Sequence, residues 1–223
     1  MTMSKLIKWN GVMTVITGSL FLIWSGLLAS IAPSLTSGFE LVDMVRDDFW
    51  TEYNVLGSLA SILLPLTLIG LYASQASRIG LTGLVGFLTA FFGGLLLAWI
   101  QLEETFVWPV LSAEAPTLVD LEGPLFEDPA FLVTFLASGL LFMGGFLVFA
   151  VASIRARIFP RWSSVLLGVG AALFGIGTAL FGVGDALFDM GRVLVIARTV
   201  GVLLLATALV WLGYSQYRYL IIV

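Results

Sequence analysis

The chain has 223 residues, of which 60% are hydrophobic and only 11% are charged. A soluble domain carries about a quarter charged residues, so this composition indicates an integral membrane protein without a sizeable soluble domain. The chain contains no cysteine and no histidine, which excludes disulfides, thiolate catalysis and the commonest ligands of haem and transition metals. We therefore expect no cofactor and no metal site, while a bound lipid is compatible with the composition.

Six apolar stretches are long enough to cross a bilayer, which takes about 20 residues of helix. The first follows Lys5 and Lys8 and has no clear cleavage site, so we interpret it as a retained helix rather than a signal peptide. The expected helices cover residues 9–32, 54–73, 81–103, 131–154, 162–185 and 193–214. The sequence thus predicts a single all-α domain, a bundle of six transmembrane helices spanning residues 1–223.

Two acidic connections, residues 34–53 and 104–130, join the first two helices and the third to the fourth. In the first connection, Val42, Val45 and Phe49 recur at helical spacing between acidic residues, which predicts a short amphipathic segment on the membrane face. The second connection keeps several apolar residues, so we expect it to fold against the same face.

The charges are segregated along the chain. If the N-terminus lies inside, seven of the ten basic residues are on the inner side and all fourteen acidic residues are on the outer side. Connections rich in Lys and Arg remain cytoplasmic, so we predict that both termini face the cytoplasm of a prokaryotic cell, in its cytoplasmic (inner) membrane. Interfacial tryptophans are expected at both edges: Trp9, Trp162 and Trp211 inside, Trp50 and Trp108 outside.

The fifth helix contains a repeat of seven residues that begins at Leu166. Glycine is unfavourable in a water-exposed helix, but in a bilayer small residues let neighbouring backbones approach closely. One row of small residues comprises Gly168, Ala172, Gly175, Ala179, Gly182 and Ala186, and the other comprises Gly170, Gly177 and Gly184. Because the two rows lie on nearly opposite sides, we predict a central helix that is packed on both.

A candidate ligand or ion-pair site lies at the outer ends of the third, fifth and sixth helices. It consists of Gln101, Glu104, Asp185, Arg192 and Arg198. If Tyr214 marks the inner boundary, Arg198 lies roughly 24 Å away, within an apolar core about 30 Å thick. A charge there requires a partner or water, and Asp185 or Glu104 is the natural partner. The alternatives are an ion pair that only joins helix ends, or an arginine that reaches the headgroups.

Three arginines, Arg155, Arg157 and Arg161, lie in the connection between the fourth and fifth helices. They are candidates for contact with anionic lipid headgroups. The alternative is that they serve only as the orientation signal. Membrane lipids are the expected partners, other membrane subunits or further copies of the chain remain open, and no nucleic-acid partner is expected.

Three segments resemble patterns in small, uncharacterised multi-helix proteins of bacterial membranes. They are Leu71 to Gly80, Phe106 to Val110 and Arg155 to Trp162. The resemblance covers the second to fifth helices. It implies a prokaryotic cell-membrane origin and carries no activity.

Three classes of function are compatible with this sequence. We favour a non-enzymatic membrane protein, either an accessory subunit of a larger complex or a binder of a lipid-like or small ligand at its outer face, because no catalytic constellation is evident. A small-solute or ion transporter or channel is the first alternative, although the helix middles offer few polar residues for a path. A membrane enzyme using outer carboxylates is the second, although Glu103 and Glu104 are adjacent and point about 100° apart on a helix.

Overall fold

A computed structural model describes residues 3–35, 41–119, 123–180 and 191–219. All regular secondary structure in these residues is helical, and six helices are long and apolar enough to span a membrane, which confirms the predicted fold class. The six are α1 (Met3–Leu35), α3 (Asp48–Ala73), α4 (Ala76–Leu102), α7 (Pro129–Ala156), α8 (Arg161–Ala179) and α10 (Gly191–Tyr219). Shorter helices are α2 (Leu41–Val45), a π-helix (Glu103–Val107), α5 (Trp108–Glu114), a 3-10 helix (Pro116–Leu118) and α6 (Pro124–Glu127).

Two helices, α3 and α7, begin earlier than predicted because acidic residues cap their first turns. The Asp47 side chain accepts a hydrogen bond from the Phe49 N–H, so α3 begins at Asp48 rather than at residue 54. Asp128 caps α7 in the same way, accepting from the N–H groups of Ala130 and Phe131. The polar connections are therefore shorter than expected.

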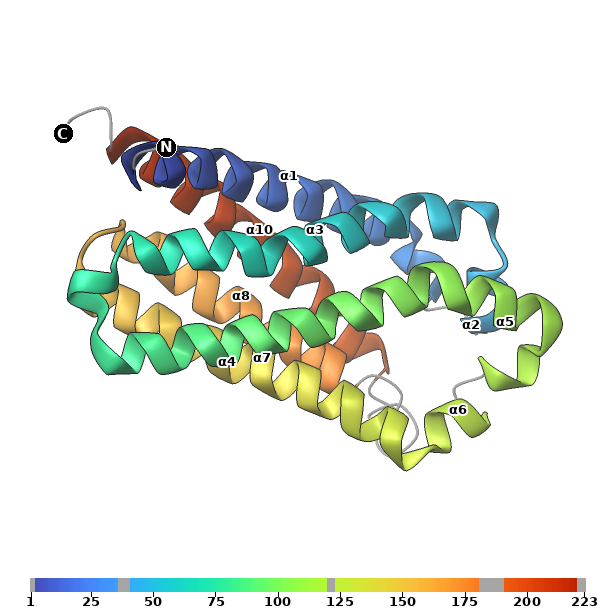
Figure 1. Ribbon diagram of the computed structural model, residues 1–223. Coiled ribbons are helices and arrows are strands. Elements are labelled where there is room, and N and C mark those ends of the chain that lie inside the picture. The colour runs from blue at the N-terminus through green and yellow to red at the C-terminus, as the bar shows by residue number, and fades with distance from the viewer. Residues whose placement is uncertain (1–2, 36–40, 120–122, 181–190, 220–223) are drawn as a thin grey trace.

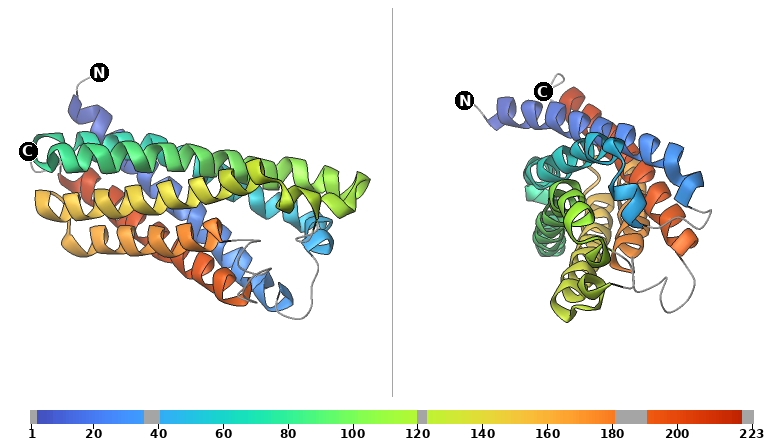
Figure 2. Two further views of the ribbon diagram at one scale, coloured as in Figure 1. Left: turned by 90° about the horizontal axis from the view of Figure 1, so that it is seen from below. Right: turned by 90° about the vertical axis from the view of Figure 1, so that its right-hand side faces the viewer.

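The six long helices form a closed ring in which each packs mainly against two neighbours. In order around the ring they are α1, α3, α4, α7, α8 and α10, and α10 returns to α1. The axes of α4, α7 and α8 are nearly aligned, while the axes of α1 and α10 cross them obliquely (Figure 2). The start of α1, the end of α10 and the turns α3–α4 and α7–α8 lie at one end, which we call the basic end (Figure 1). At the opposite end, which we call the acidic end, lie α2, α5 and α6.

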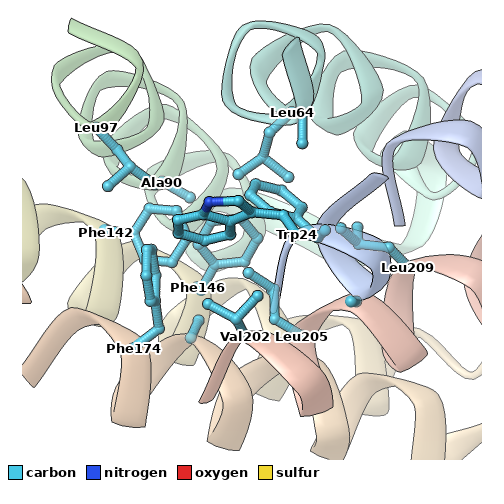
Figure 3. Close-up of a cluster of buried hydrophobic side chains, with 14 of the residues drawn as sticks. Trp24, Leu64, Ala90, Leu97, Phe142, Phe146, Phe174, Val202, Leu205 and Leu209 are labelled. Carbon is cyan, nitrogen blue, oxygen red and sulfur yellow. The ribbon is translucent and has the colours of Figure 1, made fainter. Parts of the chain in front are cut away.

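Large apolar side chains fill the middle of the ring. Trp24, Phe142, Phe146 and Phe174 are at most 1% exposed, and Figure 3 shows them converging with leucines from α3 and α10. Phe142 packs edge-on against Phe174, with ring centroids 5.5 Å apart, which joins α7 to α8. This apolar layer separates the two ends of the bundle.

The two rows of glycine on α8 face different helices. A Cβ on Gly175 would lie 2.7 Å from the Gly139 carbonyl oxygen of α7, whereas one on Gly170 would lie 2.8 Å from the Gly201 carbonyl oxygen of α10. Gly168 also faces α7. The helix α8 has the largest buried share of the six spans, although it is one member of the ring and is not enclosed by the other five. The predicted packing residues Gly182, Gly184 and Ala186 lie outside the described residues.

Close backbone contact at glycines is not confined to α8. Gly86 and Gly93 of α4 lie against the backbone of α7, and Gly145 of α7 lies against the backbone of α4 at Ala90. Gly11 of α1 faces Gly213 of α10 in the same manner. Added side chains would meet backbone atoms at all these positions, so glycine sets the spacing of four of the six interfaces in the ring.

The helix α3 packs differently from the other five. Its Gly57 faces the indole of Trp24 and its Gly70 faces the amide of Asn10, so both glycines accommodate side chains rather than a neighbouring backbone. Its contacts with α1, α4 and α10 include several buried or part-buried side-chain hydrogen bonds. Polar side chains therefore contribute more to the position of α3 than close backbone approach does.

Candidate functional site

The site at the acidic end is built around Glu104, which lies in the π-helix that continues α4. Pro109 follows five residues later and has no N–H to donate. The π-type bond from the Trp108 N–H to the Glu103 carbonyl forms, but the equivalent donor for the Glu104 carbonyl would be Pro109. The indole N–H of Trp50 donates to this carbonyl instead, at 2.8 Å. Thus the π-helix and α3 are joined where the chain cannot complete its own hydrogen bonds.

The carboxylate of Glu104 forms an ion pair with Arg198 of α10. The Arg198 Nη2 lies 3.2 Å from Glu104 Oε2, and the two side chains are 13% and 4% exposed, respectively. The guanidinium also lies over the rings of Trp24 and Phe174, at 5.9 and 5.8 Å from their centroids. A charge pair withdrawn from solvent needs such additional contacts to offset its desolvation.

A network of uncharged polar groups lies beside this pair. Asn54 Oδ1 accepts from the Trp24 indole N–H at 3.2 Å and from Gln101 Nε2 at 3.1 Å, linking α1, α3 and α4. One turn further along α3, the hydroxyls of Ser58 and Thr105 are 2.7 Å apart. All five residues are nearly inaccessible to solvent, so α3 is fixed to both of its neighbours at this end.

A small cavity of about 40 Å³ opens between these elements. Its walls come from α1, α2, α3, the π-helix, α5 and α10: Trp24, Leu41, Met44, Trp50, Tyr53, Asn54, Glu104, Trp108 and Arg198. Two of these walls carry N–H donors that have no acceptor among the described residues, Asn54 Nδ2 and Trp108 Nε1. Both residues are at most 2% exposed, and native proteins rarely leave such groups unsatisfied.

The structure brings together some of the residues proposed from sequence and not others. Arg198 pairs with Glu104, one of the two expected partners. Gln101 bonds to Asn54 and is not part of the ion pair. Asp185 lies outside the described residues, and Arg192 lies in α10 with its side chain outside the described part.

Two tryptophans depart from the sequence prediction. Trp50 and Trp108 were expected at the outer membrane interface, but they are only 5% and 1% exposed. Their rings are nearly parallel, with centroids 6.5 Å apart. They are buried because α2 packs against α3 and α5 at the acidic end, where these elements form a cap. At the basic end, Trp9, Trp162 and Trp211 are exposed, as the interfacial prediction requires.

Four residues of this site were not predicted from the sequence: Trp24, Asn54, Ser58 and Thr105. A signal for them exists in the spacing of polar residues. Asn54 and Ser58, and also Gln101 and Thr105, are four apart on otherwise apolar helices, so each pair shares one face. A polar face on a membrane helix normally points toward protein rather than lipid.

A second buried polar cluster lies at the basic end. The amide of Asn10 in α1 donates to the Thr67 carbonyl of α3 at 3.2 Å and to Gln216 Oε1 of α10 at 3.1 Å. Gln216 in turn donates to the Gly70 carbonyl at 3.0 Å and to the Ser74 hydroxyl at 2.7 Å. This cluster joins α1, α3 and α10, and the apolar layer separates it from the site at the acidic end.

Within the described parts of the chain, no group of three or more carboxylate, histidine or cysteine side chains is arranged to hold a metal ion. Comparisons with protein-family models, curated proteins and solved structures found no match. The site must therefore be interpreted from its own geometry.

Proposed function

We propose that this chain is a non-enzymatic, multi-pass membrane protein that binds a small amphipathic ligand at its acidic end. The observation that carries the proposal is the pair of unpartnered donors, Asn54 Nδ2 and Trp108 Nε1, in the walls of one cavity. Each buried and unsatisfied N–H costs about 1–3 kcal/mol. Acceptor oxygens of a ligand in this cavity would satisfy these donors.

The chemistry of the walls defines the class of ligand. A cavity of about 40 Å³ admits only a small group, such as a hydroxyl, carbonyl or ether oxygen, rather than a whole drug-sized molecule. Leu41 and Met44 of α2 provide an apolar wall next to the polar one. We therefore infer an amphipathic molecule whose oxygen-bearing end enters the cavity while its apolar part lies along the cap or in the lipid.

The orientation is also part of the proposal. The charge segregation supports a basic end in the cytoplasm and an acidic end outside a bacterial inner membrane. The ligand would then be reached from the outer leaflet or the outer aqueous phase. The same surface could bring the protein into a larger membrane complex as an accessory subunit.

The experiment compares two tryptophan substitutions in protein purified in mild detergent from its native membrane. Trp108→Phe removes the donor that has no acceptor, while Trp50→Phe removes the donor already bonded to the Glu104 carbonyl. Both keep an aromatic ring. Co-purifying small molecules and subunits are then identified by mass spectrometry.

We expect a defined molecule to accompany the wild type and to be depleted in Trp108→Phe, while the thermal stability of that variant is unchanged or higher. Trp50→Phe should lose stability by about 1 kcal/mol. A wild-type protein that carries neither ligand nor subunit overturns the proposal. A molecule that Trp108→Phe retains equally also overturns the proposal, since its binding would not depend on the Trp108 donor and the cavity would hold no more than water.

Transport is a second candidate because buried polar clusters occur at both ends of α3. Asn54 and Ser58 lie at the acidic end, and Thr67 and Ser74 lie at the basic end. Buried polar groups in spanning helices often mark solute or ion paths. Leu64, fully buried between the clusters, blocks a direct connection, so transport would require α3 to move. Solute flux would be measured in liposomes that contain the protein, with Arg198→Ala as control. The absence of flux for all tested solutes would count against this candidate.

A further inference from the structure

The turn between α7 and α8, at the basic end, forms a hollow of about 770 Å³. It is lined by Ile154, Arg155, Arg157, Phe159 and Arg161. Arg157 ends α7 in the left-handed conformation, with φ 53° and ψ 32°, where glycine or asparagine is usual. Phe159 is 7% exposed and anchors the turn, and Pro160 directs the chain into α8. The fold therefore holds three arginines around one concave surface.

Among the residues that the structure describes, none forms an ion pair with these arginines. The one ion pair found among the described residues joins Arg198 to Glu104 at the other end of the bundle. Arg161 lies 5.8 Å from the centroid of the Trp162 ring, a contact that attracts the guanidinium but does not neutralise its charge. Three exposed cations around one hollow repel one another, and an anion between them would relieve that repulsion. The hollow is thus electrostatically suited to an anion.

The position of the hollow relative to the membrane indicates which kind of anion it suits. It lies where two apolar spans meet, since one ends at Ala156 and the next begins at Arg161. Trp162 is 63% exposed, as expected for an indole at the headgroup level. Val151 and Val169, on α7 and α8, are both 44% exposed on the apolar side. An anion with acyl chains would therefore contact both the arginines and the apolar surface beside them.

We propose that this hollow is a binding site for the phosphate headgroup of an anionic phospholipid. Arginine pairs with phosphate through two parallel hydrogen bonds, which a lipid phosphodiester can accept. The lipid tails would lie along α7 and α8. This site is separate from the cavity at the acidic end and does not depend on the function proposed for that cavity.

The test measures lipid retention by native mass spectrometry. Protein is exchanged into detergent containing equal amounts of phosphatidylglycerol and phosphatidylcholine with identical chains. The variant is Arg155→Gln/Arg161→Gln. The matched control is Lys5→Gln/Arg78→Gln, which removes two exposed charges at the same end but outside the hollow. A conservative variant, Arg155→Lys/Arg161→Lys, keeps the charge and loses the paired geometry. A further arm adds soluble glycerol phosphate as competitor.

We expect the wild type to retain phosphatidylglycerol over phosphatidylcholine, and the glutamine variant to lose that preference by about 100-fold, since each charge-assisted hydrogen bond to the phosphate contributes roughly tenfold. The control should change it little, and the lysine variant should lie between. Equal losses in the glutamine variant and the control would overturn the proposal, because they would show a general surface-charge effect. Full displacement by glycerol phosphate would also overturn it, since the site would then recognise a free phosphate.

Discussion

Replacing Glu104 by glutamine tests how much the buried ion pair contributes to the free energy of unfolding. The substitution keeps the shape of the side chain and leaves the Glu104 carbonyl free to accept from Trp50. It removes only the negative charge that lies 3.2 Å from the Arg198 guanidinium. The arginine then remains on an apolar helix, surrounded by Trp24 and Phe174.

Two independent magnitudes give the size of the effect. Removing one partner of a buried pair costs about 3–5 kcal/mol, and the 13% exposure of Arg198 places this pair at the lower end. Placing a charged arginine in a membrane helix costs about 2.5–3.5 kcal/mol on insertion scales, and the Glu104 charge offsets most of this cost. Both indicate a loss of about 3 kcal/mol, which is more than a hundredfold in the folding equilibrium.

The assay is unfolding by sodium dodecyl sulfate in mixed micelles, followed by tryptophan fluorescence. Glu103→Gln is the matched control, because Glu103 is the adjacent carboxylate and is partly exposed. The double variant Glu104→Gln/Arg198→Gln should lose at least 1 kcal/mol less than the sum of the two single variants. The reasoning fails if Glu104→Gln and Glu103→Gln are equally stable, or if the two single losses simply add.

Three further results are expected. Gly145→Val should destabilise the bundle by about 1–3 kcal/mol, because its Cβ would meet the backbone of Ala90. Gly144→Ala should be tolerated, because no atom lies within 4 Å of a Cβ added there. Equal effects of the two variants in thermal unfolding would contradict the packing. Since the chain has no cysteine, Arg78→Cys and Glu114→Cys provide single labelling sites in whole cells, and we expect an impermeant maleimide to modify only Glu114→Cys; the reverse pattern would invert the orientation. Hydrogen exchange should be faster in the middle of α3 than in α8, because α3 has fewer close backbone contacts; slower exchange in α3 would contradict this account of its packing.

Much of the fold was predictable because a bilayer limits the choices. Apolar stretches of spanning length must be helical, so the six spans follow from the pattern of apolar residues along the chain. The rows around Gly170 and Gly175 also predicted contact on two sides, and the structure places α10 and α7 there. What the rows could not predict is the closed ring, because which helices become neighbours depends on the crossing angles of all six.

The cap at the acidic end was less predictable. Residues 104–130 have no strong periodicity, and whether Trp108 faces lipid or protein depends on how the helix continues beyond α4. The π-helix before Pro109 shifts the face of the helix on which Trp108 lies, and a hydrophobic pattern does not predict a π-helix. Trp50 and Trp108 were therefore assigned to the interface when they belong to the core.

The same comparison explains why both polar clusters include α3. Five helices of the ring contact a neighbour at glycine. These interfaces depend on close van der Waals contact, which is lost when the two helices move apart. The helix α3 is fixed by hydrogen bonds from Asn54, Ser58 and Gln216, which average only about 0.6 kcal/mol each within membranes. Such bonds can exchange partners with a ligand or with water at small cost. A rearrangement of this bundle would therefore involve α3 first, and the cavity that borders α3 is the place where a ligand could bias it.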